Sequence, residues 1–164
     1  MLQAPDTVSD FPARAAGRGL QVDWTWVGDG DEDLRTGMTE AGWHVTGWIP
    51  REEVRAVLAE SLVLVHPARY EGQPLAVLEA MSLGTPVVGR DIDGIRELQG
   101  VEVFDREDRA LEQIAELCDD PESWERHSRA ALRGTDDLSP SAQCQRLLHV
   151  YGLARTHVPT GAGR

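Results

Sequence analysis

The sequence contains no lysine, so every one of its 16 basic residues is an arginine. Against these stand 28 acidic residues, which give a formal net charge of -12. Nucleic acids and anionic membranes bind basic surfaces, so this charge argues against both as non-specific partners. Any contact of the chain with phosphate must therefore come from arginine or from the backbone.

Cysteines and long apolar runs are also scarce. Cys118 and Cys144 lie far apart, without a CxxC pair or a histidine-rich partner, which excludes the usual spacing of a zinc site and of a disulfide framework. We expect two buried free thiols and no metal. The longest apolar runs, such as residues 62–65, are far too short to cross a bilayer, and no secretory leader is read at Met1. We therefore expect a soluble, cytoplasmic protein without an integral membrane segment.

The length of 164 residues suits one domain with a sizeable core. Residues 1–21 form an N-terminal segment with a possible short helix at 11–19, which Asp10 would cap. Residues 22–155 form the main domain. Residues 156–164 are expected to be a flexible tail.

Strand-like and helix-like segments alternate through the main domain. Strands are expected at 22–27, 44–48, 62–65, 86–89 and 101–104. Helices are expected at 32–42, 51–60, 75–83, 94–99, 106–119, 122–134 and 140–155, with Asp105 as the cap of the helix at 106–119. This alternation predicts an α/β fold, a Rossmann-like doubly wound parallel sheet with C-terminal helices. Ligands of such sheets bind beyond the carboxyl ends of the strands, where Gly28, Gly47, Pro67 and Arg90 fall.

The helix expected at 75–83 is apolar on almost every side except at Glu79. A buried carboxylate is costly without a partner, so Glu79 requires one. Glu71 lies eight positions earlier and, at 3.6 residues per turn, would fall on the same helical stripe. Between them the Gly-Gln-Pro sequence at 72–74 gives a helix start that could receive phosphate. The alternative is a solvated helix on which two glutamates coincide.

Four pieces of sequence surround this helix: a strand with its following proline at 62–67, Glu71-Gly72-Gln73-Pro74, Glu79-Ala80-Met81, and Gly84-Thr85-Pro86-Val87-Val88. Together they resemble the donor-nucleotide site of the retaining glycosyltransferases of family 4, which have the GT-B fold. The resemblance implies that Glu71 lies by the donor sugar and that Glu79 takes the ribose hydroxyls. It also implies that the backbone of Gly72, Gln73 and Pro74 approaches the diphosphate, although Pro74 has no N–H to donate. These roles suit a carboxylate that accepts two hydroxyls and a helix start that favours an anion.

The same resemblance assigns roles near the nucleoside. The turn at Gly28 and Gly30 resembles the family's glycine-rich loop, although such a pair also suits a plain tight turn. Trp48 and Ile49 follow the second strand, where the family reads the nucleobase. Trp48 could stack on the base or only pack at the rim of the core.

Three further residues are candidates for the site. His66 either faces the ligand or is a satisfied core histidine. Arg69 and Arg90 are the nearest groups that could pair with a diphosphate, and the alternative for both is a solvated surface charge.

The resemblance covers roughly residues 22–151, and two parts of the family pattern are absent. One is the acceptor domain; the other is most or all of the opening strand, with the arginine and lysine that follow it. We therefore expect a nucleoside diphosphate sugar-binding domain of a retaining hexosyltransferase that needs an acceptor domain, a partner chain or a homo-oligomer for activity, and no cofactor. The alternatives are a non-catalytic nucleotide-sugar-binding or protein-interaction module and a different GT-B enzyme, such as a nucleotide-sugar epimerase.

Overall fold

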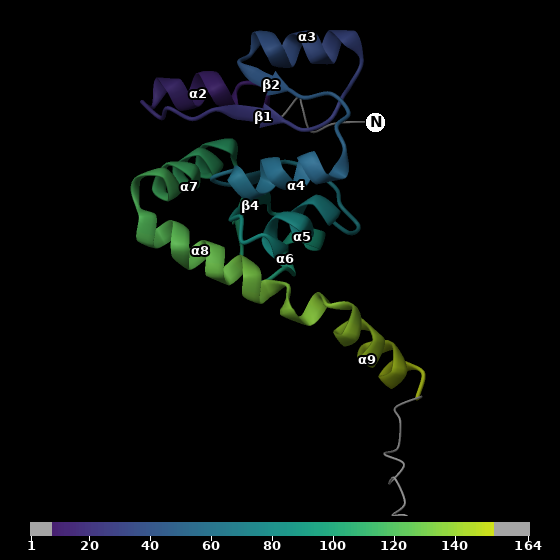
Figure 1. Cartoon of the computed structure of the whole chain (residues 1–164). Coiled ribbons are helices and arrows are strands. Elements are labelled where there is room, and N and C mark those ends of the chain that lie inside the picture. Colours follow the sequence, from purple (N-terminus) through teal and green to yellow (C-terminus); the bar gives the residue numbers. More distant parts are fainter. Residues whose placement is uncertain (1–7, 153–164) are drawn as a thin grey trace, which may run out of the picture.

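The computed structural model of the protein describes residues 8–152, in which short parallel strands alternate with helices (Figure 1). The α/β class is confirmed. The elements of the first half are α2 (Phe11–Gly17), β1 (Trp24–Trp26), α3 (Glu32–Glu40), β2 (Trp43–Val45), α4 (Arg51–Glu60) and β3 (Leu64–His66). Those of the second half are α5 (Leu75–Ser82), β4 (Val87–Arg90), α6 (Asp93–Arg96), β5 (Val101–Phe104), α7 (Glu107–Asp119), α8 (Pro121–Gly134), η1 (Asp136–Leu138) and α9 (Pro140–Val150).

The strands form two parallel sheets. β1 pairs with β2, and β3, β4 and β5 pair in that order. β4 is the central strand of its sheet, because Val88 lies opposite both Val65 and Glu102. Within residues 8–152 no strand pairs with the second edge of β1 or of β3. In the described residues the parallel strands thus form two separate sheets rather than one continuous layer.

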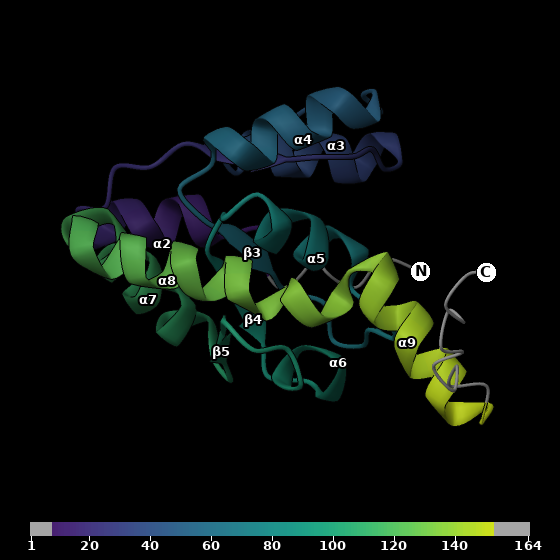
Figure 2. The same ribbon diagram turned by 60° about the horizontal axis from the view of Figure 1, so that its bottom comes forward.

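Two apolar clusters cover the two faces of the strands. Neighbouring residues of one strand enter opposite clusters: Val88 belongs to the first and Val87 to the second, while Val65 packs on the first and Leu64 on the second. Helices α2 and α7 supply the first cluster, and α5 and α8, which pack side by side (Figure 2), supply the second. Each fully buried aliphatic or aromatic side chain contributes about 1.5–3 kcal/mol. This alternation is the packing of a layer with helices on both faces.

Both predicted aspartate caps are wrong. Asp10 occupies the N-cap of α2, but its side chain makes no cap hydrogen bond and lies 3.5 Å from the Arg14 guanidinium. The N-cap of α7 is Arg106, and the Asp105 carboxylate lies 3.7 Å from the Arg106 guanidinium. In both places the carboxylate forms an ion pair with a nearby arginine and, within the described residues, makes no hydrogen bond to the helix backbone.

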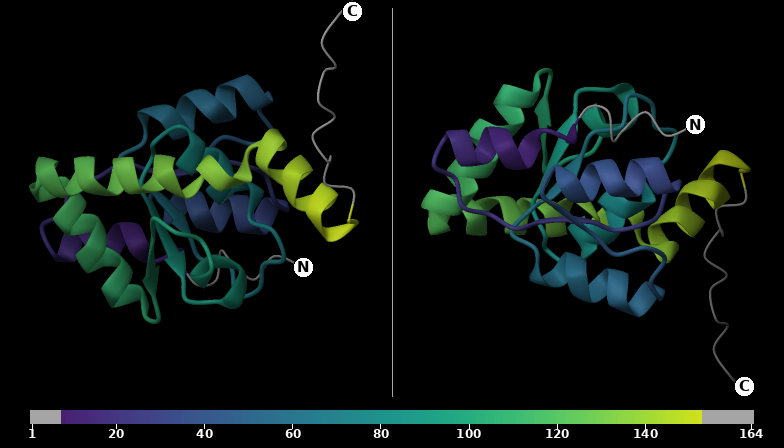
Figure 3. Two further views of the ribbon diagram at one scale, coloured as in Figure 1. Left: turned by 90° about the horizontal axis from the view of Figure 1, so that it is seen from below. Right: turned by 90° about the horizontal axis from the view of Figure 1, so that it is seen from above.

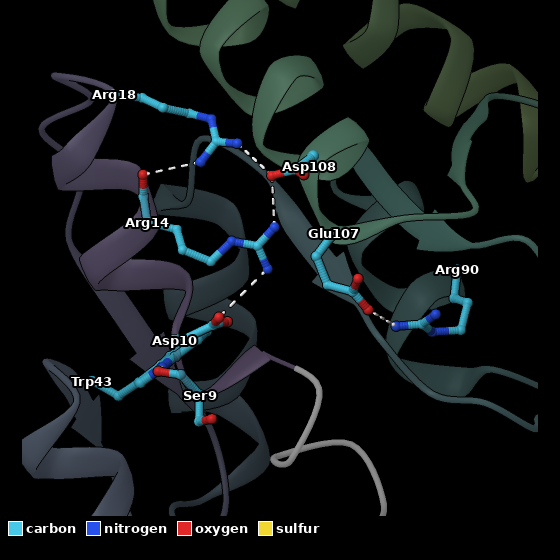
Figure 4. A network of polar contacts seen from close by, with 8 residues as sticks. All are labelled: Ser9, Asp10, Arg14, Arg18, Trp43, Arg90, Glu107 and Asp108. Carbon is cyan, nitrogen blue, oxygen red and sulfur yellow. Dashed lines mark hydrogen bonds and ion pairs between the residues drawn. The ribbon is translucent and has the colours of Figure 1, made fainter.

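Ion pairs fix α2 to the start of α7 (Figure 4). The Arg14 guanidinium donates to the Asp108 carboxylate at 2.7 Å, and Arg18 donates to the same oxygen. The Arg14 hydrogen bond, followed by that of Arg18, holds the pKa of Asp108 below its ordinary value. Burial of Phe11 and Ala15 anchors the same helix from its other side.

Most element boundaries differ from those predicted by a few residues, and two of the differences have clear local reasons. β3 begins at Leu64 rather than at residue 62, because the Leu62 carbonyl accepts a hydrogen bond from the Trp124 indole of α8 at 2.8 Å. The strand is half-buried rather than fully covered. α9 ends at Val150 and is followed by Gly152 at φ 64°, a backbone conformation that commonly ends helices. Its predicted continuation to 155, the tail and residues 1–7 lie outside the described residues.

Both cysteines are free, and burial raises the pKa of the half-buried Cys118 thiol. Cys144 is exposed, so the prediction that both thiols are buried is wrong for it. It lies on α9, which projects from the body of the molecule in both panels of Figure 3 and so has no core around it. In the described part of the chain, no helix is long and apolar enough to cross a membrane.

Candidate functional site

The candidate site lies at the carboxyl end of β3, which His66 ends. Parallel pairing puts His66 opposite Gly89 of β4, so Arg90 lies at the same edge of the sheet. The loop that follows β3 is pressed against the start of α6, since a Cβ on Gly94 would lie only 2.6 Å from the Glu71 carbonyl oxygen. Glycine at 94 therefore permits the close approach that positions this loop.

Glu71 lies in this loop and not on α5. The helix begins at Leu75, after Pro74 at its N-cap, so the prediction of one helical stripe through both glutamates is wrong. The proline disfavours helical backbone at the residue before it, which stops the helix from reaching back to Glu71. The Glu71 carboxylate is 28% exposed, accepts from the Gly72 N–H at 3.1 Å, and lies 3.6 Å from Nε2 of His66.

The His66 side chain is largely buried, and one of its ring nitrogens has no hydrogen-bond partner among the described residues. Its side chain is 14% exposed, and burial lowers its pKa although the Glu71 charge opposes that shift. The imidazole is therefore neutral at neutral pH. Its Nε2 atom is buried without a hydrogen-bond partner in the described chain, because 3.6 Å to Glu71 is too long for a hydrogen bond. Of the two sequence-based alternatives, the contacts within residues 8–152 do not match a fully hydrogen-bonded core histidine.

Glu79 has the partner that its sequence context requires. The Arg51 guanidinium, at the start of α4, donates to the Glu79 carboxylate at 2.7 Å. Glu79 is 29% exposed and Arg51 is 76% exposed, so the contact sits at the surface and opens readily to solvent. The helix around Glu79 is less buried than predicted, because Leu75 and Ala76 are exposed.

The segment between the two glutamates forms the start of α5. Gly72 and Gln73 are exposed and Pro74 is buried. The Gly72 N–H is engaged by Glu71, and α5 begins without a side-chain cap. A helix start of this kind leaves backbone donors for an external acceptor.

The side chain of Arg90 is held by contacts with other parts of the fold. Its Nη2 donates to Glu107 at 2.8 Å, as Figure 4 shows. Its Nε donates to the Pro67 carbonyl at 3.0 Å, and its guanidinium lies 5.2 Å from the centre of the Phe104 ring. The hydrogen bond from Arg90 lowers the pKa of Glu107. By contrast, Arg69 is exposed, and among residues 8–152 no hydrogen bond or ion pair engages it.

The remaining candidates lie at the carboxyl ends of β1 and β2. Gly28, at φ 133°, bridges to Gly47, at φ 69°, and both conformations favour glycine. Gly30 touches the Leu34 side chain closely, since a Cβ there would lie 2.5 Å from it. Trp48 is 87% exposed, which excludes rim packing, and Ile49 is half-buried. In the described chain, no hydrogen bond or ion pair joins these residues to Glu71 or Glu79.

Sequence reasoning missed three residues that shape the site: Arg51, Gly94 and Glu107. The need of Glu79 for a cation was a signal for Arg51, since the preceding helix begins with this arginine. Gly94 and Glu107 act through tertiary contacts, which no pattern of neighbouring residues in the sequence predicts. Within the described residues, no group of three or more histidine, cysteine, aspartate or glutamate side chains is arranged to hold a metal ion.

Fold and site together define an α/β domain of parallel strands with its candidate site at the carboxyl edge of the strands. The sequence profile of the family described as "Glycosyl transferases group 1" matches residues 7–120. The chain therefore belongs to this family.

Curated relatives are much longer than this chain. It is 30% identical over 147 residues to the glycogen synthase of Mycobacterium tuberculosis (strain ATCC 25618 / H37Rv), a match that covers 85% of this chain and 34% of that protein. It is 32% identical over 123 residues to the D-inositol 3-phosphate glycosyltransferase of Thermobispora bispora, covering 69% of this chain and 29% of that one. The chain thus spans about a third of the length of these relatives.

Solved structures share the fold. TarM matches with a TM-score of 0.78 over 92% of this chain and 33% of its own, at 18% identity. HepE from Anabaena, in complex with UDP-glucose, matches with a TM-score of 0.74 over 93% of this chain and 46% of its own, at 16% identity. At such identities the likeness concerns the fold alone.

Proposed function

We propose that this chain is the donor-binding domain of a retaining, family 4-like hexosyltransferase and that its ligand is a nucleoside diphosphate sugar. One observation carries the proposal: two half-buried carboxylates, Glu71 and Glu79, flank the uncapped start of α5 at the carboxyl edge of β3. Membership of the group 1 glycosyltransferases supports this reading. So does the fold shared with HepE, whose structure contains UDP-glucose.

In the proposed complex each part of the ligand meets a group of matching chemistry. Glu79 accepts both ribose hydroxyls once Arg51 has moved away from it. The backbone donors at the start of α5 meet the diphosphate anion. Arg69 supplies the cation, because Arg90 is held by Glu107. In the proposal Trp48 and Ile49 contact the base, and the turn that contains Gly28 and Gly30 lies close to the nucleoside.

The proposed reaction moves a hexosyl group and keeps its anomeric configuration. The bond between the anomeric carbon and the diphosphate oxygen breaks, and a bond to an acceptor hydroxyl oxygen forms on the same face of the sugar. The hydroxyl proton is released, and the nucleoside diphosphate leaves. Glu71 lies beside the sugar. Transfer requires both substrates to be held in register, so we propose that another domain, a partner chain or a second copy holds the acceptor.

Calorimetric titration with UDP-, GDP- and dTDP-sugars tests the donor site. We expect saturable binding of one nucleotide class and at least tenfold weaker binding by Glu79→Ala, since a hydrogen bond to a charged group contributes about 1.5–3 kcal/mol. Glu60→Ala is the matched control, because Glu60 is an exposed glutamate at the end of α4. No binding by a folded chain would refute the donor site and favour a non-catalytic interaction module.

A further inference from the structure

His66 carries a polar atom that the fold encloses and leaves without a partner. Its Nε2 is buried and forms no hydrogen bond with the described chain. Buried polar atoms in native proteins are nearly always paired, because an unpaired one lowers the stability of the folded state. An apolar side chain at this strand end would avoid that cost. The imidazole therefore requires a reason outside the packing of β3.

The position of the atom indicates what it serves. Nε2 lies 3.6 Å from the Glu71 carboxylate, so the two groups face each other without bonding directly. A neutral imidazole has one ring nitrogen that donates and one that accepts, whereas a carboxylate only accepts. An alcohol hydroxyl both donates and accepts, so one hydroxyl can bond to both groups at once. The diphosphate group of a nucleotide sugar carries no proton at neutral pH, so it cannot donate to Glu71 and would be repelled by its charge.

We propose that His66 and Glu71 together form a hydrogen-bonding site for one hydroxyl of the donor sugar. The proposal rests on the proposed function, because Glu71 is the group assigned to the sugar side of the ligand. It makes His66 a sugar-binding residue that separates nucleoside diphosphate sugars from the bare nucleoside diphosphate. Glu79, which serves the nucleoside side, is engaged with Arg51, and within residues 8–152 no hydrogen bond or ion pair joins either residue to His66.

The proposed site also predicts that replacing His66 weakens ligand binding without lowering the stability of the folded chain. Replacement of His66 by leucine removes an unpaired polar atom from a half-buried strand, so the folded chain should lose no stability. The same replacement should remove the sugar's share of the affinity. A histidine that served only the fold would show the opposite pattern.

Calorimetry of the full chain tests this with the best-binding nucleotide sugar and its bare nucleoside diphosphate. We expect His66→Leu to weaken binding of the nucleotide sugar at least fivefold, to change binding of the bare diphosphate less than twofold, and to keep the melting temperature at or above that of the wild type. His66→Gln places an amide group near Nε2 and should restore part of the affinity. His44→Leu, a change at an exposed histidine on β2, is the control and should alter neither titration.

Several outcomes would overturn the proposal. Equal weakening of both ligands, or an unchanged preference for the sugar in His66→Leu, would show that His66 does not contact the sugar. If His66→Leu does not fold, imidazole NMR of the wild type decides: the nucleotide sugar, but not the bare diphosphate, should slow exchange of the His66 ring proton. No difference between the two ligands would reject the site. A wild type that binds neither ligand would instead reject the proposed function itself.

Discussion

Arg90 joins three parts of the fold through one guanidinium group: the Pro67 carbonyl, the Glu107 carboxylate and the Phe104 ring. We predict that Arg90→Ala lowers the free energy of unfolding by about 2–3 kcal/mol, because it leaves half-buried acceptors without a charged donor. Urea unfolding measures this change. Arg69→Ala is the control and should stay within about 0.5 kcal/mol, as expected for an exposed side chain. Equal effects of the two substitutions would contradict the structural role of Arg90.

The same ion pair makes the fold sensitive to acid. Arg90 lowers the pKa of Glu107 below its ordinary value of 4.5 in the folded state. A carboxyl group with a lowered folded pKa stabilises the protein above its unfolded pKa, and this contribution is lost as the pH falls through the folded pKa. We predict that the contribution of the pair is complete at pH 7 and declines below about pH 4.5. Melting temperatures across this range should fall less steeply for Glu107→Gln than for the wild type; parallel curves would exclude Glu107 as a source.

Arg51 donates a hydrogen bond to the Glu79 carboxylate, which the proposed ribose contact needs. We predict that Arg51→Ala strengthens nucleotide binding by up to about fivefold, because an exposed ion pair is worth at most about 1 kcal/mol and no longer has to be broken. Titration of Arg51→Ala beside Arg55→Ala, an exposed arginine on the same helix, measures the effect. Weaker binding by Arg51→Ala alone would mean that Arg51 turns to the ligand instead of competing with it.

The parts of the candidate site that depend on residues close together in the chain could be predicted from the sequence. Glu79 demanded a partner because its neighbours are apolar, and Arg51 is that partner. The helical stripe through Glu71 failed, because a proline restricts the residue before it and starts the helix only at Leu75. The binding of Arg90 by Glu107 depends on a contact between β4 and α7 that spacing within one segment cannot show.

At the scale of elements, α8 packs on the chain that leads into β5 so closely that only glycine fits. A Cβ on Gly134 would lie 2.0 Å from the Gln99 carbonyl oxygen. We predict that Gly134→Ala destabilises the protein by about 1–3 kcal/mol or more, because backbone must move to admit the methyl group. Gly37→Ala on the exposed face of α3, where nothing lies within 4 Å, should instead stabilise it by roughly 0.5–1 kcal/mol. Urea unfolding of both variants provides the test; effects of the same sign would refute the packing argument.

Helices and strands were predictable because apolar periodicity marks them. The helix at 51–60 and the strand at 101–104 were predicted with the bounds that α4 and β5 have. Ends were less predictable where a tertiary contact decides them, as the Trp124 indole does at Leu62. The pairing of strands into two sheets is a property of long-range contacts, and periodicity within one strand contains no information on it.

At the scale of the whole molecule, the content of the proposed site bears on activity. The site receives the donor at the carboxyl edge of the strands, and none of its residues is assigned to an acceptor. Transfer requires both substrates to be held in register, so in our proposal another domain, a partner chain or a second copy holds the acceptor.

We therefore predict that the isolated chain binds its donor but releases nucleoside diphosphate no faster with an acceptor alcohol than without one. Proximity of two held substrates supplies an effective concentration of up to about 10⁵–10⁸ M, and a chain that holds only the donor forgoes it. A coupled assay of diphosphate release measures this, with the Mycobacterium tuberculosis glycogen synthase as positive control. Acceptor-dependent release by the isolated chain would mean that a second copy, or residues of this domain itself, holds the acceptor. Light scattering under the assay conditions would separate these two cases, because only the first requires a dimer.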